Sequence, residues 1–334
     1  MVRRGIVNIT EGSPSGASNS NNFGVGSPSS PNPGYSPPSS TVYYAYVVNT
    51  FSGTVSVIKV STNTVVATVS VGSSPVDVAI TPDGNYAYVT NSGSNSVSVI
   101  KVSTNTVVAT VSVGSSPQGD AITPDGNYAY VVNYNSGTVS VIQISTNTVV
   151  ATVSVGSSPV DVAITPDGNY AYVTNSGSNN VSVIQISTNT VISTISVEVN
   201  PYGVAITPDG NYAYVTNSGS NSVSVIKVST NTVVATVSVG SNSQGVAVTP
   251  DGNYAYVTNS GSNNVSVIQI STNTVIDTVT VGSGPRRVAI TPDGSYVYVV
   301  NALFKTVSVI QTSTNTVIDT VTVGSSPQGV AITP

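Results

Sequence analysis

The sequence predicts an all-β fold, a seven-bladed β-propeller in which each blade is a sheet of four antiparallel strands. A unit of 42 residues recurs without insertion or deletion, and seven copies of it fill residues 41–334. Each copy holds four short runs rich in Val, Ile, Thr and Tyr, separated by turn formers, and no segment has a sustained helical period. Four strands in about 40–45 residues, repeated around a ring, are typical of a propeller.

The second copy illustrates the elements that we expect in each blade. Its first strand covers 76–81 and ends in a Pro-Asp-Gly-Asn turn, where proline presets φ and glycine accepts a positive φ. The second strand covers 86–90, and a polar loop leads to the third at 97–102. A Ser-Thr-Asn-Thr hairpin joins the third strand to the fourth, 107–113, which is the outermost. The first strand of each copy is then the innermost strand of its blade.

The two ends of the repeating region predict how the ring closes. The first copy lacks its opening strand and turn, because Thr41 occupies the position of Asp83 in the second copy. The missing strand stands at the other end of the chain, at 328–333. We therefore expect the C-terminal strand to complete the first blade, so that main-chain hydrogen bonds close the ring.

Composition excludes several classes of function. Charged residues make up only 6% of the chain and the formal net charge is −5, without a basic stripe, so nucleic acid is not an expected partner. The chain has no His and no Cys, which removes the usual general base and the usual ligands of zinc and haem. No apolar run is long enough to span a membrane. We expect no cofactor, no metal and no insertion into a membrane.

The second strand of every copy ends in one of two closely similar motifs. Tyr-Val-Thr-Asn stands at 88–91, 172–175, 214–217 and 256–259, and Tyr-Val-Val-Asn at 46–49, 130–133 and 298–301. With these motifs the chain resembles the YVTN-family β-propellers, which are known from archaeal surface-layer proteins and bacterial secreted proteins. The resemblance covers residues 41–334 and implies a seven-bladed propeller and a place at the cell surface, but no chemistry.

Residues that depart from the repeat mark a candidate site at one mouth of the central channel. Near the start of the innermost strand most copies have Gly, Val or Gln, whereas single copies carry the five residues Asp77, Asp161, Tyr202, Arg286 and Arg287. One interpretation is a small polar binding site. The other is a solvated rim in which Arg287 pairs loosely with a carboxylate, worth about 0–1 kcal/mol.

Residues that every copy shares have simpler interpretations. The aspartates of the Pro-Asp-Gly turns lie one per blade, too far apart to converge on a calcium ion, so we interpret them as turn residues. The repeated Tyr pairs are interpreted as core between blades rather than as a platform for sugars. Asp120 replaces a repeated Val, and it needs a partner if it points between blades.

Residues 1–40 form an N-terminal arm outside the ring. Residues 2–10 are β-prone, and residues 11–40 are a Pro/Ser/Gly/Asn tether. We expect Val2, Ile6, Val7 and Ile9 to drive self-assembly, with the strand docking on the outermost strands of a neighbouring copy, whose edges carry no Lys, Pro or expected bulge. Alternatively, the arm packs on its own propeller or spaces it from a cell surface.

These features lead to three functional hypotheses. The first is a non-enzymatic extracellular structural protein, a homopolymeric subunit of a surface layer or filament. The second is a secreted module that binds a glycan or peptide, or another cell-surface partner, at the channel mouth. The third is an enzyme of the lactonase kind. Asn-x-Ser/Thr triplets predict glycosylation at Asn8, Asn180 and Asn264.

Overall fold

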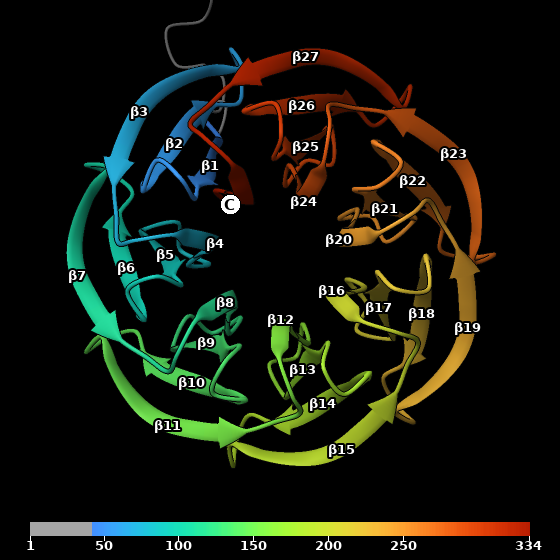
Figure 1. The fold of residues 1–334 in the computed structure, drawn as a ribbon, viewed down its shortest axis with the longest axis horizontal. Coiled ribbons are helices and arrows are strands. Elements are labelled where there is room, and N and C mark those ends of the chain that lie inside the picture. The colour runs from blue at the N-terminus through green and yellow to red at the C-terminus, as the bar shows by residue number, and fades with distance from the viewer. Residues whose placement is uncertain (1–41) are drawn as a thin grey trace, which may run out of the picture. The chain divides into compact units, whose positions relative to one another are not determined.

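The computed structural model describes residues 42–334, which form a ring of seven four-stranded antiparallel sheets with the innermost strands around a common centre (Figure 1). We number the blades 1 to 7 in chain order. Blade 1 contains β28, β1, β2 and β3 from inside to outside, and blade 2 contains β4, β5, β6 and β7, a pattern that continues to blade 7 with β24 to β27. No helix is present between residues 42 and 334, so none of this part could cross a membrane as a helix.

The strands recur at four radial positions. The innermost strands are β4 (Pro75–Ile80), β8 (Pro117–Ile122), β12 (Pro159–Ile164), β16 (Pro201–Ile206), β20 (Ser243–Val248), β24 (Pro285–Ile290) and β28 (Pro327–Ile332). The second strands are β1 (Tyr44–Asn49), β5 (Tyr86–Asn91), β9 (Tyr128–Asn133), β13 (Tyr170–Asn175), β17 (Tyr212–Asn217), β21 (Tyr254–Asn259) and β25 (Tyr296–Asn301). The third strands are β2 (Thr54–Lys59), β6 (Ser96–Lys101), β10 (Thr138–Gln143), β14 (Asn180–Gln185), β18 (Ser222–Lys227), β22 (Asn264–Gln269) and β26 (Thr306–Gln311). The outermost strands are β3 (Thr64–Ser70), β7 (Thr106–Ser112), β11 (Thr148–Ser154), β15 (Thr190–Ser196), β19 (Thr232–Ser238), β23 (Thr274–Thr280) and β27 (Thr316–Thr322).

The expected closure is confirmed. β28 pairs antiparallel with β1, with Ala45 opposite Ile332 and Val47 opposite Val330. Val330 is buried in the same apolar cluster as Ala45 and Val47, so the seam is packed as well as hydrogen-bonded. The strands that we expected in the second copy also form, with ends that differ by one or two residues.

The core lies between the blades. A tyrosine at the middle of each second strand, such as Tyr88, is fully buried and packs with valines of its own blade and the next. Burial raises the pKa of Tyr88 to about 12, and its hydroxyl donates to Oδ1 of Asn147 on blade 3 at 2.7 Å. All seven copies make this bond to the following blade, at 2.5–2.7 Å. Of each pair of tyrosines that we interpreted as core, Tyr88 and its equivalents are core residues. Tyr86 and its equivalents, at the start of the strands, are only half-buried.

The outermost strands carry a bulge that we did not expect. In blade 1, Val57 is opposite Ala67 and Ile58 is opposite Val65, so Val66 is an extra residue without a partner. The outermost strands of the other six blades repeat the pattern. A bulge twists an edge strand away from regular pairing. The expectation that these edges lack bulges was therefore wrong.

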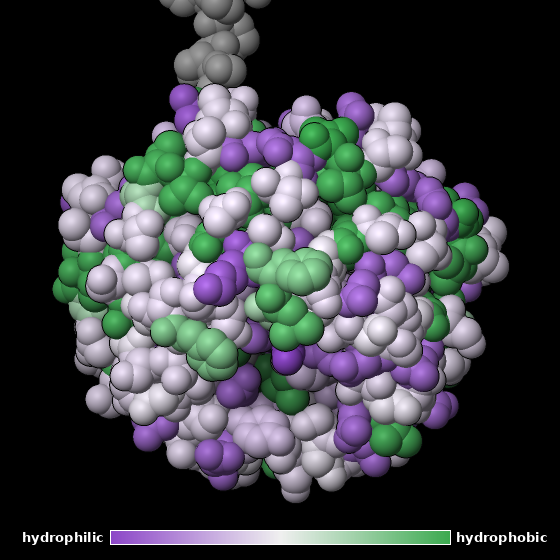
Figure 2. Space-filling view, turned by 45° about the horizontal axis from the view of Figure 1, so that its top comes forward, coloured by the Kyte–Doolittle hydropathy of each residue, from purple (hydrophilic) through white to green (hydrophobic). Residues whose placement is uncertain are grey.

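The surface matches the low charge of the sequence. In Figure 2 pale and purple residues predominate on the face in view, with green residues scattered among them. The residues that supply this surface are chiefly the Ser, Thr and Asn of the turns and loops, which are exposed or half-buried. Larger exposed apolar side chains are therefore conspicuous where they occur.

Candidate functional site

A bulge at the start of the innermost strand positions the candidate site. In blade 2, Pro75 is opposite Asn91 and Val78 is opposite Val89, so two residues, 76 and 77, face Thr90 alone. The hydroxyl of Thr90 accepts from the N–H of Asp77 at 3.0 Å and donates to the carbonyl of Gln118 in blade 3 at 2.5 Å. The Thr of Tyr-Val-Thr-Asn thus supports the bulge and ties it to the next blade, while the bulge presents two side chains to the channel mouth.

The channel mouth is bridged by one arginine. Arg287 of β24 forms ion pairs with Asp77 of β4, at 3.0 Å, and with Asp161 of β12. These strands are not neighbours in the ring: β28 separates β24 from β4 on one side, and β20 and β16 separate β24 from β12 on the other (Figure 1). The three side chains are at most 14% exposed. The structure thus brings three of the predicted residues together. Arg287 pairs with carboxylates, as one interpretation expected, but the pairs are largely buried rather than loose and solvated.

Backbone donors complete the surroundings of both carboxylates. The N–H of Val78 donates to Oδ1 of Asp77 at 3.0 Å, and the N–H of Val204 donates to Oδ2 of Asp161 at 3.1 Å. Burial raises the pKa of Asp77 to about 6. The charge of Arg287 only partly opposes this rise, and the charge of Asp161 adds to it. For Arg287 burial alone would lower the pKa, but the two aspartates raise it above its ordinary value. The guanidinium is therefore always charged, whereas Asp77 can take up a proton near neutral pH.

Glycines make room for these charged residues. A Cβ on Gly119 would lie 2.5 Å from Oδ1 of Asp161, and a Cβ on Gly329 would lie 2.7 Å from Oδ1 of Asp77. Each glycine occupies the same register position as the aspartate on the adjoining innermost strand. The alternation of Gly with Asp in the sequence is thus a packing requirement of the channel mouth.

Asp120 is a third buried carboxylate beside this pair. It occupies the position of Val78 and Val162, both of which pack in apolar clusters between blades. Asp120 is 8% exposed, and neither carboxylate oxygen has a hydrogen-bond partner among the described residues. Burial raises its pKa well above the ordinary value, and the charge of Asp77 adds to the rise. The sequence signalled this residue as a departure from the repeat. The charge of Arg287 and the N–H of Ala79 only partly oppose the rise of its pKa.

The remaining residues of the mouth surround the ion pairs. The Arg287 guanidinium carbon lies 5.7 Å from the centroid of the Tyr202 ring, a cation–π contact. Arg286 is half-buried, and its carbonyl accepts from the hydroxyl of Thr258. Gln244, which sequence reasoning missed, is almost fully buried: its Nε2 donates to Oδ1 of Asn242 at 2.7 Å, and its Oε1 has no partner among residues 42–334. Its position in the repeat could have identified it, because Tyr202 and Arg286 occupy the same position in neighbouring blades.

The chemistry of the mouth follows from its charges. Three carboxylates face one guanidinium, so the cluster favours protons and opposes anions. Within residues 42–334 no three Asp or Glu side chains come together as metal ligands. The Asp residues of the turns are occupied locally: the Asp83 carboxylate accepts from the Thr81 hydroxyl at 2.6 Å and from the N–H of Asn85 at 3.0 Å, and the Thr81 bond is the main reason that its pKa is lowered.

The other predicted residues divide into two groups. Asn180 and Asn264 begin β14 and β22, where they are half-buried and accept from the side-chain amides of Asn175 and Asn259 at 2.9 and 2.8 Å. Glycosylation at both remains a prediction. The remaining positions, Asn8 and the four apolar residues of the arm, lie outside the described residues.

Seven repeated four-stranded blades, with several departures from the repeat gathered at the channel mouth, define a repeat-built propeller. The chain belongs to the YNCE-like β-propeller family, whose profile matches residues 31–333. No curated protein matches the sequence.

Solved structures share this fold over most of their length. Hydrazine synthase of Kuenenia stuttgartiensis is 26% identical, with a TM-score of 0.75 over 80% of this chain and 92% of that one. A protein of unknown function from Desulfotomaculum acetoxidans is 22% identical, with a TM-score of 0.78 over 86% and 98%. A candidate 6-phosphogluconolactonase from Bacteroides fragilis is 18% identical, with a TM-score of 0.77 over 90% and 100%. Propellers of this shape therefore occur in proteins described as enzymes and in one whose function is unknown.

Proposed function

We propose that the protein is a non-catalytic structural protein of the cell exterior, a subunit of a surface layer or filament whose N-terminal arm docks on a neighbouring copy. One observation carries the proposal. Phe51 is 84% exposed in blade 1, and Leu303 and Phe304 are 73% and 63% exposed in the adjacent blade 7. All three belong to loops between the second and third strands, at the same end of the ring as the channel mouth.

These side chains are not required by the fold. Blades 2, 4, 5 and 6 have Asn-Ser-Gly-Ser-Asn at the equivalent loop and form the same sheets. Large exposed apolar groups on two neighbouring loops mark an interaction surface, because burying each would gain about 1.5–3 kcal/mol. We call Phe51, Leu303 and Phe304 the apolar loop patch.

The proposed occupant is the segment 2–10 of another copy. It carries Val2, Ile6, Val7 and Ile9, and about thirty residues of polar tether separate it from the ring, at a small cost in loop-closure entropy. The bulges make the outermost strands poorer acceptors than we first expected, which favours the apolar loop patch. Since the side chains proposed to make the contact are apolar, assembly should depend only weakly on salt.

The residues at the channel mouth also favour a non-catalytic role. An acid–base pair of carboxylates must reach a substrate, whereas Asp77 and Asp161 are tied to Arg287 and Asp120 is buried. The chain has no histidine or cysteine to replace them.

The test compares the assembly of three full-length or truncated proteins by sedimentation and electron microscopy. The intact chain should form ordered polymers. Deletion of residues 1–10, and separately the triple change Phe51→Ser, Leu303→Ser and Phe304→Asn, should each leave folded single propellers. The control removes three exposed apolar side chains elsewhere, by Val66→Ser, Val108→Ser and Val150→Ser on the outer strands, and should still polymerise.

Two results would refute the proposal: an intact chain that stays monomeric, or a truncated chain that polymerises like the intact one. The first would favour the second candidate, a binding module at the channel mouth. That candidate is supported by Oε1 of Gln244, which is buried and has no hydrogen-bond partner among residues 42–334, at the register that Tyr202 and Arg286 occupy in the neighbouring blades. A peptide or glycan bound there should be lost on Tyr202→Ala and Gln244→Ala.

A further inference from the structure

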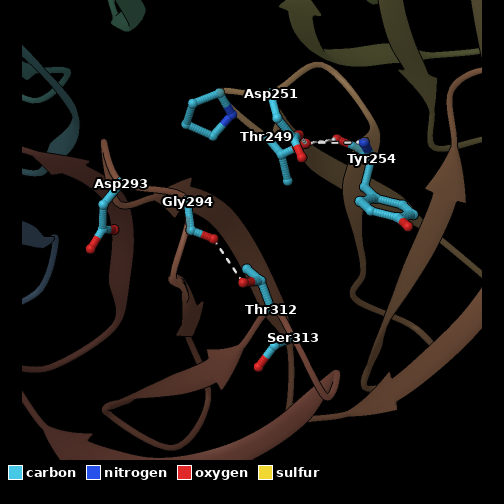
Figure 3. Close-up of a pocket in the computed structure, with 8 residues that line it drawn as sticks. Thr249, Asp251, Tyr254, Asp293, Gly294, Thr312 and Ser313 are labelled. Atoms are coloured by element: carbon cyan, nitrogen blue, oxygen red, sulfur yellow. Dashed lines mark hydrogen bonds between the residues drawn. The ribbon is translucent and has the colours of Figure 1, made fainter. Parts of the chain in front are cut away.

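A crevice opens between blades 6 and 7 at the opposite end of the ring from the channel mouth. It has a volume of about 270 Å³ and lies between two successive Pro-Asp-Gly turns (Figure 3). Blade 6 contributes one wall and blade 7 the other, and neither wall includes a residue of the channel mouth. The lining residues are Thr249, Pro250, Asp251, Tyr254, Asp293, Gly294, Thr312 and Ser313.

This crevice departs from the repeat at two positions. Thr312 stands where the other six blades have Val or Ile, and Ser295, next to the lining, stands where the other Pro-Asp-Gly turns have Asn. The equivalent crevice between blades 2 and 3, of about 390 Å³, is lined instead by Ile144. The fold accepts the apolar residue, so the hydroxyl of Thr312 is not needed for folding.

The two changes make the crevice rich in hydrogen-bond acceptors. In the other turns, a side-chain amide donates to the second carboxylate oxygen, as Asn253 does to Asp251 at 2.7 Å. Ser295 has no amide, and the short bonds to Asp293 come from Thr291 at 2.5 Å and the N–H of Ser295 at 3.0 Å, both to Oδ1. The Ser295 hydroxyl is only a weaker donor to this carboxylate and contributes less than Thr291 to lowering its pKa. The Thr312 hydroxyl donates to the carbonyl of Gly294 at 2.7 Å, which leaves its oxygen free to accept.

We propose that this crevice binds a neutral pyranose sugar of a glycan. Sugar hydroxyls donate to Asp251, Asp293 and Thr312, and two carboxylates oppose an anionic ligand. The half-buried ring of Tyr254 supplies an apolar surface of the kind on which the C–H face of a pyranose packs. The site is independent of the apolar loop patch and of polymer formation.

The experiment titrates the full chain with three neutral probes, maltotriose, cellotriose and chitotriose, by ligand-observed NMR and calorimetry. At least one probe should bind saturably. Thr312→Ile, which restores the residue of the equivalent crevice, should weaken binding about tenfold, corresponding to about 1.4 kcal/mol. Ser313→Arg should abolish binding, because an exposed side chain at that position fills the crevice.

Two controls separate the crevice from nonspecific effects. Ser145→Arg makes the same charge change at the crevice between blades 2 and 3 and should leave binding unchanged. Thermal unfolding should show that all variants are folded. Absence of saturable binding of all three probes would overturn the proposal, as would equal losses in Ser313→Arg and Ser145→Arg.

Discussion

At the residue scale, the electrostatic cost of burying charge is concentrated at a few positions that depart from the repeat. Asp120 is a buried carboxylate without a hydrogen-bond partner, in a layer where its equivalents are valines packed between blades. Removing such an orphan usually gains stability, whereas removing Arg287 would leave Asp77 and Asp161 buried without their partner and cost about 3–5 kcal/mol. The two kinds of charge should therefore respond to mutation with opposite signs.

Asp120→Val should raise the free energy of unfolding by about 1–3 kcal/mol at neutral pH. Guanidinium unfolding followed by circular dichroism measures the change. Asp120→Asn is the matched control: it removes the charge but leaves a buried polar group, and should gain less. A valine variant that is less stable than the wild type would show that Asp120 has a stabilising partner.

The same substitution should alter the pH dependence of stability. Burial raises the pKa of Asp120 and of Asp77, the latter from 3.8 to about 6, so the native state binds protons that the unfolded state has released. The free energy of unfolding should therefore fall as pH rises from about 4 through about 6, and the fall should be smaller in Asp120→Val. An identical slope in both proteins would contradict this assignment.

At the element scale, neighbouring blades are joined by hydrogen bonds as well as by packing. Each buried tyrosine hydroxyl reaches the hairpin of the next blade, where the accepting asparagine has a left-handed backbone, with φ of 52° at Asn105 and 53° at Asn147. Asparagine suits both tasks, because it tolerates this conformation and supplies the acceptor. The constant Asn of Ser-Thr-Asn-Thr is thus explained by two local requirements.

Tyr88→Phe and Asn147→Gly test this link in a double-mutant cycle. Each change removes one partner while preserving ring packing or the positive φ, and each should cost about 0.5–1.5 kcal/mol. The two costs should not add, leaving a coupling energy of about 1 kcal/mol in denaturant unfolding. Tyr86→Phe, at a half-buried tyrosine outside this bond, should show no coupling to Asn147→Gly.

At the scale of the whole molecule, strand order and ring closure could be predicted from the sequence, whereas the strand bulges and the contacts across the channel could not. An unbroken 42-residue period predicts strand order, blade number and closure because every blade must satisfy the same packing. The sequence pattern of Val and Thr in the outermost strands does not predict the bulges at Val66 and its equivalents. The pairing of Arg287 with Asp77 and Asp161 depends on distances across the channel, which a repeat period does not contain.

Deleting residues 328–334 should abolish cooperative folding. The truncation removes β28, which leaves the edge of β1 unpaired and opens the apolar cluster around Val330. Thermal unfolding by calorimetry should show a broad, weak transition. Deleting residues 1–10 is the control and should leave the transition unchanged, while unchanged melting of the C-terminal truncation would contradict the role of the closure.

The place of β1 in blade 1 has a mechanical consequence. Tension carried along the chain from the N-terminal side enters the ring at Tyr44, the first residue of β1. That strand is flanked by β28 on one side and β2 on the other, so two ladders of hydrogen bonds bear the load together. A pull along β1 shears both ladders at once, whereas a pull on an outermost strand peels one bond after another. A protein tethered by its N-terminal end is thus held at one of its interior strands, where resistance to extraction is greatest.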